Sequence, residues 1–264
     1  MTLETYAKYI SSADGGLYDD SPLGIYDSEF GDAGSPTQVL TEEYSVPECF
    51  SEDLFALVDE DEYELDKAGD TNGADGTAAS LDSTEDFSRP PWRWILIGPA
   101  RSGTGMHIDP LWTNAWVTVL QGMKRWMLFP PSCPGEGIGM VKGQQQIPSS
   151  IWFRDYYDTV TSGSWPLEWK PIEVLQRPGE TVFVPNGWAH AVLNLELTVA
   201  VTHNYASEFG PFERMWQQVV VDEPCFAKRW NSALKRRRPD LAQRAKEWHL
   251  SHAHEAWTGN VVLM

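Results

Sequence analysis

Cysteine, basic side chains and long apolar runs are all scarce in this sequence of 264 residues. The three cysteines, Cys49, Cys133 and Cys225, form no CxxC pair. Their spacing argues against a thiolate zinc site or a disulfide framework and favours a reducing compartment. No apolar run approaches the roughly 20 residues that span a bilayer, and the first residues lack the basic start of a secretory signal. We therefore expect a soluble chain that neither enters a membrane nor is secreted.

Basic residues number 20 against 38 acidic ones, which gives a formal net charge of −18. Residues 42–86 contain 16 acids and one lysine, a net charge of −15, so the rest of the chain is nearly neutral. The one basic cluster, Lys235–Arg238, is short, and we interpret it as a solvated helix end, with a nuclear import signal or a phosphate contact as the alternatives. The charge pattern does not support nucleic-acid binding.

A change in composition divides the chain. Residues 59–88 hold acids, Gly, Ala, Ser and Thr with few large apolar side chains, so the segment cannot bury enough surface to offset its ordering entropy. We predict a disordered acidic insertion there, either a solvated loop or a regulatory tether. It separates an N-terminal helix and loop part, residues 1–58, from a core over residues 89–207 and C-terminal helices over residues 208–264.

The core is predicted to consist of short strands. Eight β-branched or aromatic segments follow Pro90, separated by Gly, Pro or Asn. They span residues 92–100, 105–111, 115–122, 124–131, 171–179, 181–187, 190–196 and 198–206. The absence of crossover helices between them favours an antiparallel sandwich or barrel. The aromatic-rich residues 132–170 are the exception, and we predict an excursion that covers one mouth of the barrel.

Helical patterns flank this core. Residues 1–10 predict a short amphipathic helix, residues 11–38 an extended loop, and residues 45–58 a turn and a short helix. After Glu208, apolar residues recur at spacings of three and four, with Pro239 as a break or a helix start. This pattern predicts two or three terminal helices, which are also the candidate interface of a homodimer.

A histidine and an aspartate, His107 and Asp109, stand two apart in GTGMHIDPLWTNAW, residues 103–116. In a strand, residues i and i+2 point to the same side, so both side chains can face a barrel interior. Alone, such a pair is more often hydrogen-bonded than metal-binding. His190, however, opens a later strand after the turn Pro185–Gly187, at the barrel mouth where it can meet the first two residues.

Two histidines and one carboxylate on a β scaffold form the facial triad that suits non-haem Fe(II), because coordination positions stay open for a cosubstrate and O2. Zinc more often takes a fourth protein ligand or serves hydrolysis. Lys124 begins an otherwise apolar strand, where a lysine is either exposed at an edge or held inside by an anion. With the hydroxyls of Thr104 and Thr202 it can form an anion-binding set, although threonines are also ordinary strand residues.

Two long stretches of the chain resemble the Jumonji-C family, most closely its bifunctional arginine demethylase and lysyl hydroxylase branch, which is phosphatidylserine-receptor-like. They are RWILIGPARSGTGMHIDPLWTNAWVTVLQGMKRWMLFPP, residues 93–131, and PIEVLQRPGETVFVPNGWAHAVLNLELTVAVTHNYAS, residues 171–207. The resemblance runs from about Tyr6 to the terminal helices and omits the acidic insertion. It implies a mainly β fold, the double-stranded β-helix of jelly-roll or cupin-like barrels, with flanking N-terminal and C-terminal α-helices.

The resemblance also implies a cofactor, a cosubstrate and a substrate. Fe(II) would be bound by His107, Asp109 and His190, and 2-oxoglutarate would be held by Lys124 with Thr104 and Thr202, with O2 as the third reactant. The substrate would be a protein or peptide oxidised at a lysine or a methylated arginine, in the nucleus or the cytoplasm. We prefer lysyl hydroxylation, because it requires only that a lysine side chain reach the iron. Demethylation of a methylated arginine is the alternative.

Some features depart from the family pattern. Val117 stands where this branch usually has an asparagine near the cosubstrate, and Gly24 takes the place of an aromatic residue on the substrate side. The chain also starts later than family members, which have further N-terminal strands and helices. We therefore expect a fragment, a mis-started gene model or a trimmed homologue. These departures motivate the alternative of a catalytically silent module that binds a protein partner. A cupin acting on sugars or small molecules is a third hypothesis, and it does not predict Lys124 in the pocket.

A second group of histidines closes the chain. His249, His252 and His254 could form a metal cluster, but no carboxylate or cysteine completes the set. We interpret them as a polar helix end or tail.

Overall fold

The computed structural model of the chain describes residues 1–12, 16–59, 88–141 and 143–252. Residues 60–87, almost all of the predicted acidic insertion, lie outside the described residues. The chain divides into two compact units, one of residues 1–48 and 91–204 and one of residues 49–90 and 205–264. No helix within the described ranges has the length and apolar character needed to cross a bilayer.

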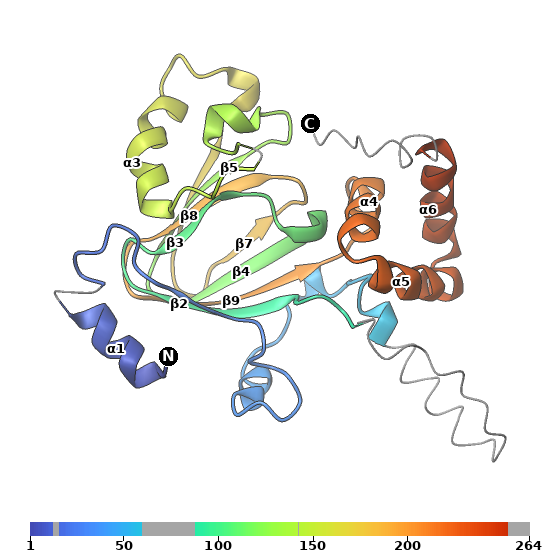
Figure 1. The fold of residues 1–264 in the computed structure, drawn as a ribbon, viewed down its shortest axis with the longest axis horizontal. Coiled ribbons are helices and arrows are strands. Elements are labelled where there is room, and N and C mark those ends of the chain that lie inside the picture. Colours follow the sequence, from blue (N-terminus) through green and yellow to red (C-terminus); the bar gives the residue numbers. More distant parts are fainter. Residues whose placement is uncertain (13–15, 60–87, 142, 253–264) are drawn as a thin grey trace. The chain divides into compact units, whose positions relative to one another are not determined.

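The first unit contains two β-sheets (Figure 1). The five-stranded sheet has the order β1-β2-β9-β4-β7, and the four-stranded sheet has the order β3-β8-β5-β6. The strands are β1 (Ile25–Asp27), β2 (Arg93–Gly98), β3 (Gly103–His107), β4 (Asn114–Gln121), β5 (Lys124–Phe129), β6 (Ile172–Gln176), β7 (Thr181–Val184), β8 (Ala189–Asn194) and β9 (Thr198–Tyr205). Antiparallel pairing between strands distant in sequence confirms the predicted double-stranded β-helix.

An apolar core lies between the two sheets because alternate residues of each strand point to the same face. Trp126, Leu128 and Val192 come from the four-stranded sheet, whereas Val119 and Val184 come from the five-stranded sheet, and all five are buried in one cluster. The polar residues of the site described below project into this same interior. The fold therefore surrounds them with apolar side chains.

The predicted position of the aromatic excursion was wrong. Its helix α3 (Ser149–Val160) packs on the outer face of the four-stranded sheet, where Trp152 contacts a cluster that includes Met127 and Ala191. These two residues alternate along β5 and β8 with Trp126 and His190, which face the interior. The segment thus covers the back of the sheet rather than a mouth of the barrel, because that face carries its own row of apolar side chains.

The N-terminal segment contains the predicted helix and one unexpected strand. Helix α1 (Leu3–Ser11) is capped by Thr2, whose hydroxyl accepts a hydrogen bond from the Thr5 amide. The loop predicted over residues 11–38 includes β1, which pairs antiparallel with β2 through Ile25 and Ile97. Three residues are too short to show a periodic pattern, so the strand arises from pairing with the edge of the sheet.

The second unit contains the predicted terminal helices, α4 (Phe212–Asp222), α5 (Pro224–Arg237) and α6 (Pro239–His252). Pro224 and Pro239 begin α5 and α6, where the missing amide hydrogen costs nothing. Trp230 is fully buried against the rings of Phe55 and Trp216. Of the C-terminal histidines, His249 is exposed on α6, and His254 lies outside the described residues.

Replacing Trp152 with alanine tests the packing of the excursion. The side chain is fully buried and its indole donates a hydrogen bond to the Ile138 carbonyl at 2.7 Å. We expect the free energy of unfolding to fall by about 3–5 kcal/mol, because the truncation leaves a cavity and an unpaired carbonyl. Urea unfolding followed by circular dichroism measures the change. Leu167→Ala, at a residue that is 82% exposed, is the control and should be neutral. Equal losses in the two variants would contradict the packing described here.

Candidate metal centre

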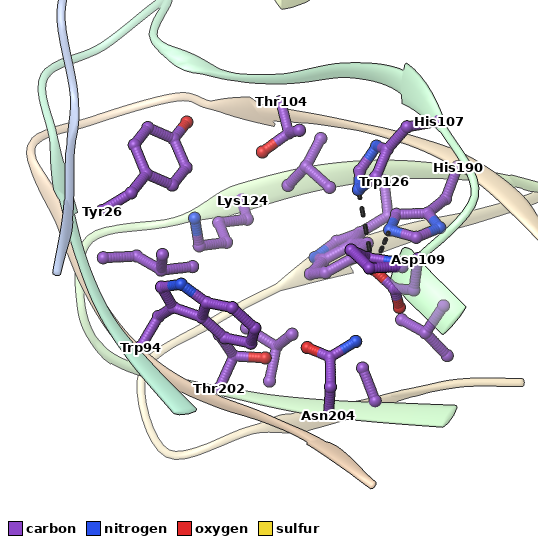
Figure 2. Close-up of a pocket in the computed structure, with 16 residues that line it drawn as sticks. Tyr26, Trp94, Thr104, His107, Asp109, Lys124, Trp126, His190, Thr202 and Asn204 are labelled. Atoms are coloured by element: carbon purple, nitrogen blue, oxygen red, sulfur yellow. Dashed lines mark ion pairs between the residues drawn. The ribbon is translucent and has the colours of Figure 1, made fainter. Parts of the chain in front are cut away.

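Two histidines face each other across adjacent strands of the four-stranded sheet. His107 ends β3 and pairs directly with His190 in β8, and the centroids of their rings are 4.1 Å apart. Asp109 follows two residues after His107, just beyond the strand rather than within it as predicted. Figure 2 shows the three side chains converging, with dashed lines from each imidazole to the carboxylate.

The distances within this triad suit one shared ion. An oxygen of Asp109, Oδ1, lies 3.6 Å from Nε2 of His107 and 3.8 Å from Nε2 of His190. One ligand atom from each residue lies within 4.8 Å of the others. The three donor atoms therefore surround a common point.

Backbone carbonyls orient both imidazole rings. Nδ1 of His107 lies 2.8 Å from the Gly105 carbonyl oxygen, and Nδ1 of His190 lies 3.1 Å from that of Trp188. A carbonyl only accepts, so each Nδ1 carries the proton and donates. In its neutral form each imidazole then presents the lone pair of Nε2 toward Asp109, which is the tautomer that a metal ligand requires.

Burial and the neighbouring charges shift the pKa of each residue in the triad. Burial, reinforced by repulsion from His107, lowers the pKa of His190 to about 4, so this imidazole is neutral at pH 7. Burial acts to raise the pKa of Asp109, but attraction to the imidazoles of His190 and His107 outweighs burial and lowers the pKa. Burial acts to lower the pKa of His107, but the adjacent carboxylate of Asp109 favours the protonated imidazole and raises the pKa instead.

One carboxylate oxygen of the triad lacks a hydrogen-bond partner among the described residues. Oδ2 of Asp109 is buried, and no hydrogen-bond partner reaches it from the described residues. A buried carboxylate oxygen without a partner is costly unless a cation completes it. Two imidazoles and one carboxylate form a set that suits a divalent first-row metal with open positions. The residues present therefore fit a metal ion.

A strained turn holds Asp109 against the segment that carries His190. Leu111 and Trp112 have positive φ values of 57° and 55°, which are unfavourable for side chains of their size. The Trp112 ring lies over Gly187, where an added Cβ would come within 2.6 Å of the ring. Gly187, with φ of 75°, thus leaves room for this contact. Such strain persists where surrounding packing enforces it, and it gathers at functional sites.

A cavity of about 240 Å³ extends from the triad into the barrel. Its walls are mainly apolar, with Leu96, Val117 and Val192 among the lining residues. Figure 2 shows the triad toward one end of the cavity and Lys124 with Tyr26 toward the other. Thr104 and Thr202 also line it, so all three predicted anion-binding residues face the cavity.

The presence of both Thr104 and His107 in the cavity depends on an irregularity in β3. Residues three apart in a regular strand point to opposite faces. The pairing of β3 with β8 shifts register between Thr104 and His107, and this shift turns both side chains to the same side.

Lys124 is buried, with 5% of its surface exposed. Burial lowers its pKa to about 8, because the charged ammonium is poorly solvated in the interior. An anion at this end of the cavity would restore the lost solvation. Of the two positions that the sequence left open for Lys124, an exposed edge or the interior, the structure has the interior.

Sequence reasoning missed three polar or aromatic residues of the cavity wall, Tyr26, Trp94 and Asn204. Asn204 stands two residues after Thr202 in β9, so the period of the strand could have identified it. Tyr26 comes from β1, which was predicted as loop. Its hydroxyl donates to the Gly103 carbonyl at 3.0 Å. Gly24, the departure noted in the sequence, lies against the ring of Tyr26, since an added Cβ would be 3.0 Å from that ring.

Comparison with known families agrees with this geometry. The family described as "JmjC domain, hydroxylase" matches residues 94–205, which include all three residues of the triad and Lys124. The chain contains a JmjC domain. The predicted family resemblance is confirmed, and the JmjC match spans the strands from β2 to β9 that build the barrel.

Several named proteins are similar to the chain that carries this JmjC domain. The bifunctional arginine demethylase and lysyl-hydroxylase psr-1 of Caenorhabditis elegans is 42% identical over 85% of this chain and 50% of its own length. The arginine-specific demethylase JMJ22 of Arabidopsis thaliana is 38% identical over 78% of this chain and 34% of its own length. The human 2-oxoglutarate and iron-dependent oxygenase JMJD4 is 30% identical over 60% of this chain and 35% of its own length. The chain spans about half the length of the nematode relatives it matches.

Replacing His190 with alanine tests the metal centre. Loss of one of three donors should weaken binding of Mn²⁺ or Fe²⁺ by more than about 100-fold, since even the loss of groups that support metal ligands costs 10- to 100-fold. Anaerobic calorimetry of the full chain measures the affinity. His249→Ala, at an exposed histidine outside the triad, is the matched control and should bind the metal as the wild type does. Unchanged affinity in His190→Ala would exclude this site.

Replacing Lys124 with methionine tests the burial of its charge. The unfolded wild type binds more protons than the folded state between about pH 8 and 10.5, so wild-type stability should rise with pH in this window. The methionine variant lacks this gain. Its stability relative to the wild type should therefore be highest near pH 7 and shrink by up to about 3 kcal/mol toward pH 10.5. Urea unfolding at several pH values measures both curves, and parallel curves would contradict a buried ammonium.

Proposed function

We propose that the chain is an Fe(II)- and 2-oxoglutarate-dependent oxygenase that oxidises a lysine or methylated arginine side chain of a protein. One observation carries the proposal: a buried triad with an unpartnered carboxylate oxygen stands at one end of a cavity, and a buried lysine stands toward the other. A small dicarboxylate matches this arrangement, with one end near the triad and the other near the ammonium. The relatives named as oxygenases, hydroxylases and demethylases support it.

Each proposed role follows from the chemistry of a side chain. His107, Asp109 and His190 would hold the metal, and Lys124 would pair with the distal carboxylate of the cosubstrate, as buried ammonium groups pair with anions. The hydroxyls of Thr104 and Thr202 would donate hydrogen bonds to the same molecule. When bound, iron and 2-oxoglutarate would supply the oxidising chemistry that places oxygen from O2 on a C–H bond.

The chain itself would position the reactants and exclude water. Apolar side chains, including Leu96, Val117 and Val192, form much of the wall around the cosubstrate. Excluding water strengthens the electrostatic contacts of Lys124 and limits side reactions. The strained turn after Asp109 and the carbonyl-oriented imidazoles would keep the ligand atoms in place before a metal binds.

The same site is compatible with two outcomes for a substrate. Oxidation of a lysine side-chain carbon leaves an alcohol, whereas oxidation of an N-methyl group is followed by loss of formaldehyde. Lysyl hydroxylation remains our preferred activity, because it requires only that a side chain reach the metal. The similarity to a protein named for both activities supports this substrate class without separating them.

A specific observation favours a second candidate, a catalytically silent module that binds a protein partner. Val117 is buried and lines the cavity. Its apolar side chain cannot form the hydrogen bond to the cosubstrate that an asparagine at this position would form. Weak retention of 2-oxoglutarate would follow from that loss.

Mass spectrometry of basic peptides distinguishes the two candidates. The full chain is incubated with Fe(II), 2-oxoglutarate, ascorbate, air and peptides that contain lysine or methylated arginine. We expect succinate together with peptides that gain one oxygen atom or lose a methyl group, and no turnover by His107→Ala. Glu196→Gln, at an exposed residue between β8 and β9, is the active control. A wild type that binds iron but forms no succinate with any peptide would favour the silent module.

A further inference from the structure

The buried ammonium of Lys124 is held by one neutral side chain. Lys124 in β5 pairs directly across the sheet with Asn194 in β8, and Nζ donates a hydrogen bond to Oδ1 of Asn194 at 2.8 Å. Asn194 is 5% exposed. Within the described part of the chain, this is the hydrogen bond that Nζ makes, so the remaining N–H groups are available for a ligand in the cavity.

A short chain of hydrogen bonds fixes the orientation of the Asn194 amide. Its Nδ2 donates to the Ser102 hydroxyl at 2.9 Å, and that hydroxyl donates to the Pro99 carbonyl at 2.6 Å. Because Ser102 uses its only hydrogen toward Pro99, it can only accept from Asn194. The oxygen of the amide must therefore face Lys124. Gly98 leaves room for these hydrogen bonds, since an added Cβ would lie 2.3 Å from the Ser102 hydroxyl oxygen.

The other cross-strand neighbour of Lys124 cannot take this role. Gln176 in β6 also pairs with Lys124, but its Oε1 accepts from the indole of Trp126 at 2.8 Å. Its Nε2 donates to the carbonyls of Val117 and Glu180, both at 2.8 Å. Both ends of the Gln176 amide are thus occupied, and Asn194 is left as the partner of the ammonium.

No carboxylate from the described residues neutralises Lys124. The polar and aromatic side chains that line its end of the cavity from β1, β2, β3 and β9 are Tyr26, Trp94, Thr104 and Thr202. Of these only Tyr26 titrates, and burial raises its pKa, so the phenol is neutral. The other titratable groups of the cavity wall, His107, Asp109 and His190, lie toward the other end (Figure 2). An acidic residue in place of Asn194 would hold the ammonium equally close but cancel its charge.

We propose that Asn194 is a positioning residue, which places the Lys124 ammonium at the end of the cavity and leaves its positive charge for the carboxylate of a dicarboxylate cosubstrate. This inference rests on the proposed function. The Asn194–Ser102–Pro99 chain sets the direction of the amide, and the amide sets the position of the charge.

Two substitutions of Asn194 should move the pH dependence of cosubstrate binding in opposite directions. The dissociation constant of 2-oxoglutarate is measured by calorimetry on the full chain loaded with Mn²⁺, from pH 6 to pH 9.5. Binding by the wild type should weaken above about pH 8, where Lys124 loses its proton. Asn194→Leu removes the acceptor, so this weakening should begin at lower pH. Asn194→Asp adds a counter-charge, so the weakening should begin at higher pH, while affinity at pH 7 falls roughly 10- to 100-fold.

Two further variants complete the experiment. Ser102→Ala loosens the Asn194 amide without touching Lys124, and it should weaken binding by about threefold to tenfold at pH 7. It keeps the test usable if Asn194→Leu does not fold. Glu196→Gln changes one exposed charge two residues from Asn194 and should bind as the wild type does.

The outcomes separate this inference from the proposed function. A wild type that does not bind 2-oxoglutarate contradicts the proposed function itself. A wild type that binds it, with variants of Asn194 that keep the wild-type pH dependence, overturns the positioning role alone. Weaker binding without any displacement of the pH dependence also overturns it, because that result describes a structural contribution and not control of the charge.

Discussion

The direct pairing of His107 with His190 across β3 and β8 is the contact on which the site depends. Backbone hydrogen bonds of the ladder bring two imidazoles from distant parts of the chain to 4.1 Å between ring centroids. A slip of one residue in this register would turn one ring to the outer face, against the α3 cluster. Burial of apolar side chains on both faces of the sheet makes such a slip costly, so core packing also protects the site.

The remaining ligand is positioned by less regular means. Asp109 lies past the end of β3, in a turn where Leu111 and Trp112 adopt left-handed backbone angles. Packing of Trp112 over Gly187 ties this turn to the segment that leads into His190. Two rigid strands thus hold the imidazoles, while a strained turn delivers the carboxylate.

The same apolar interior acts on two basic groups with different results. It lowers the pKa of His190, which keeps the imidazole neutral and able to donate a lone pair. It also lowers the pKa of Lys124, which remains largely protonated at pH 7 and gains most from an anionic ligand. Desolvation therefore prepares one end of the cavity for a cation and the other for an anion.

Short-range sequence patterns were sufficient to predict part of the fold and of the site. Strands of alternating apolar residues, helices that begin at proline, and the spacing of His107 and Asp109 are short-range features, so the sequence alone determined the barrel class and the identity of the triad. The two histidines and Lys124 could be named because each is an unusual residue type in a predicted strand, and Asp109 because of its spacing from His107.

Only the tertiary structure decided which distant residues meet. The strand around Tyr26 forms by pairing with β2, the shift in β3 turns Thr104 toward the cavity, and Asn194 becomes the partner of Lys124 through cross-strand register. The face covered by α3 was decided in the same way. These features depend on long-range backbone pairing and packing, whose energies involve residues far apart in the chain and leave no periodic signal in any short segment.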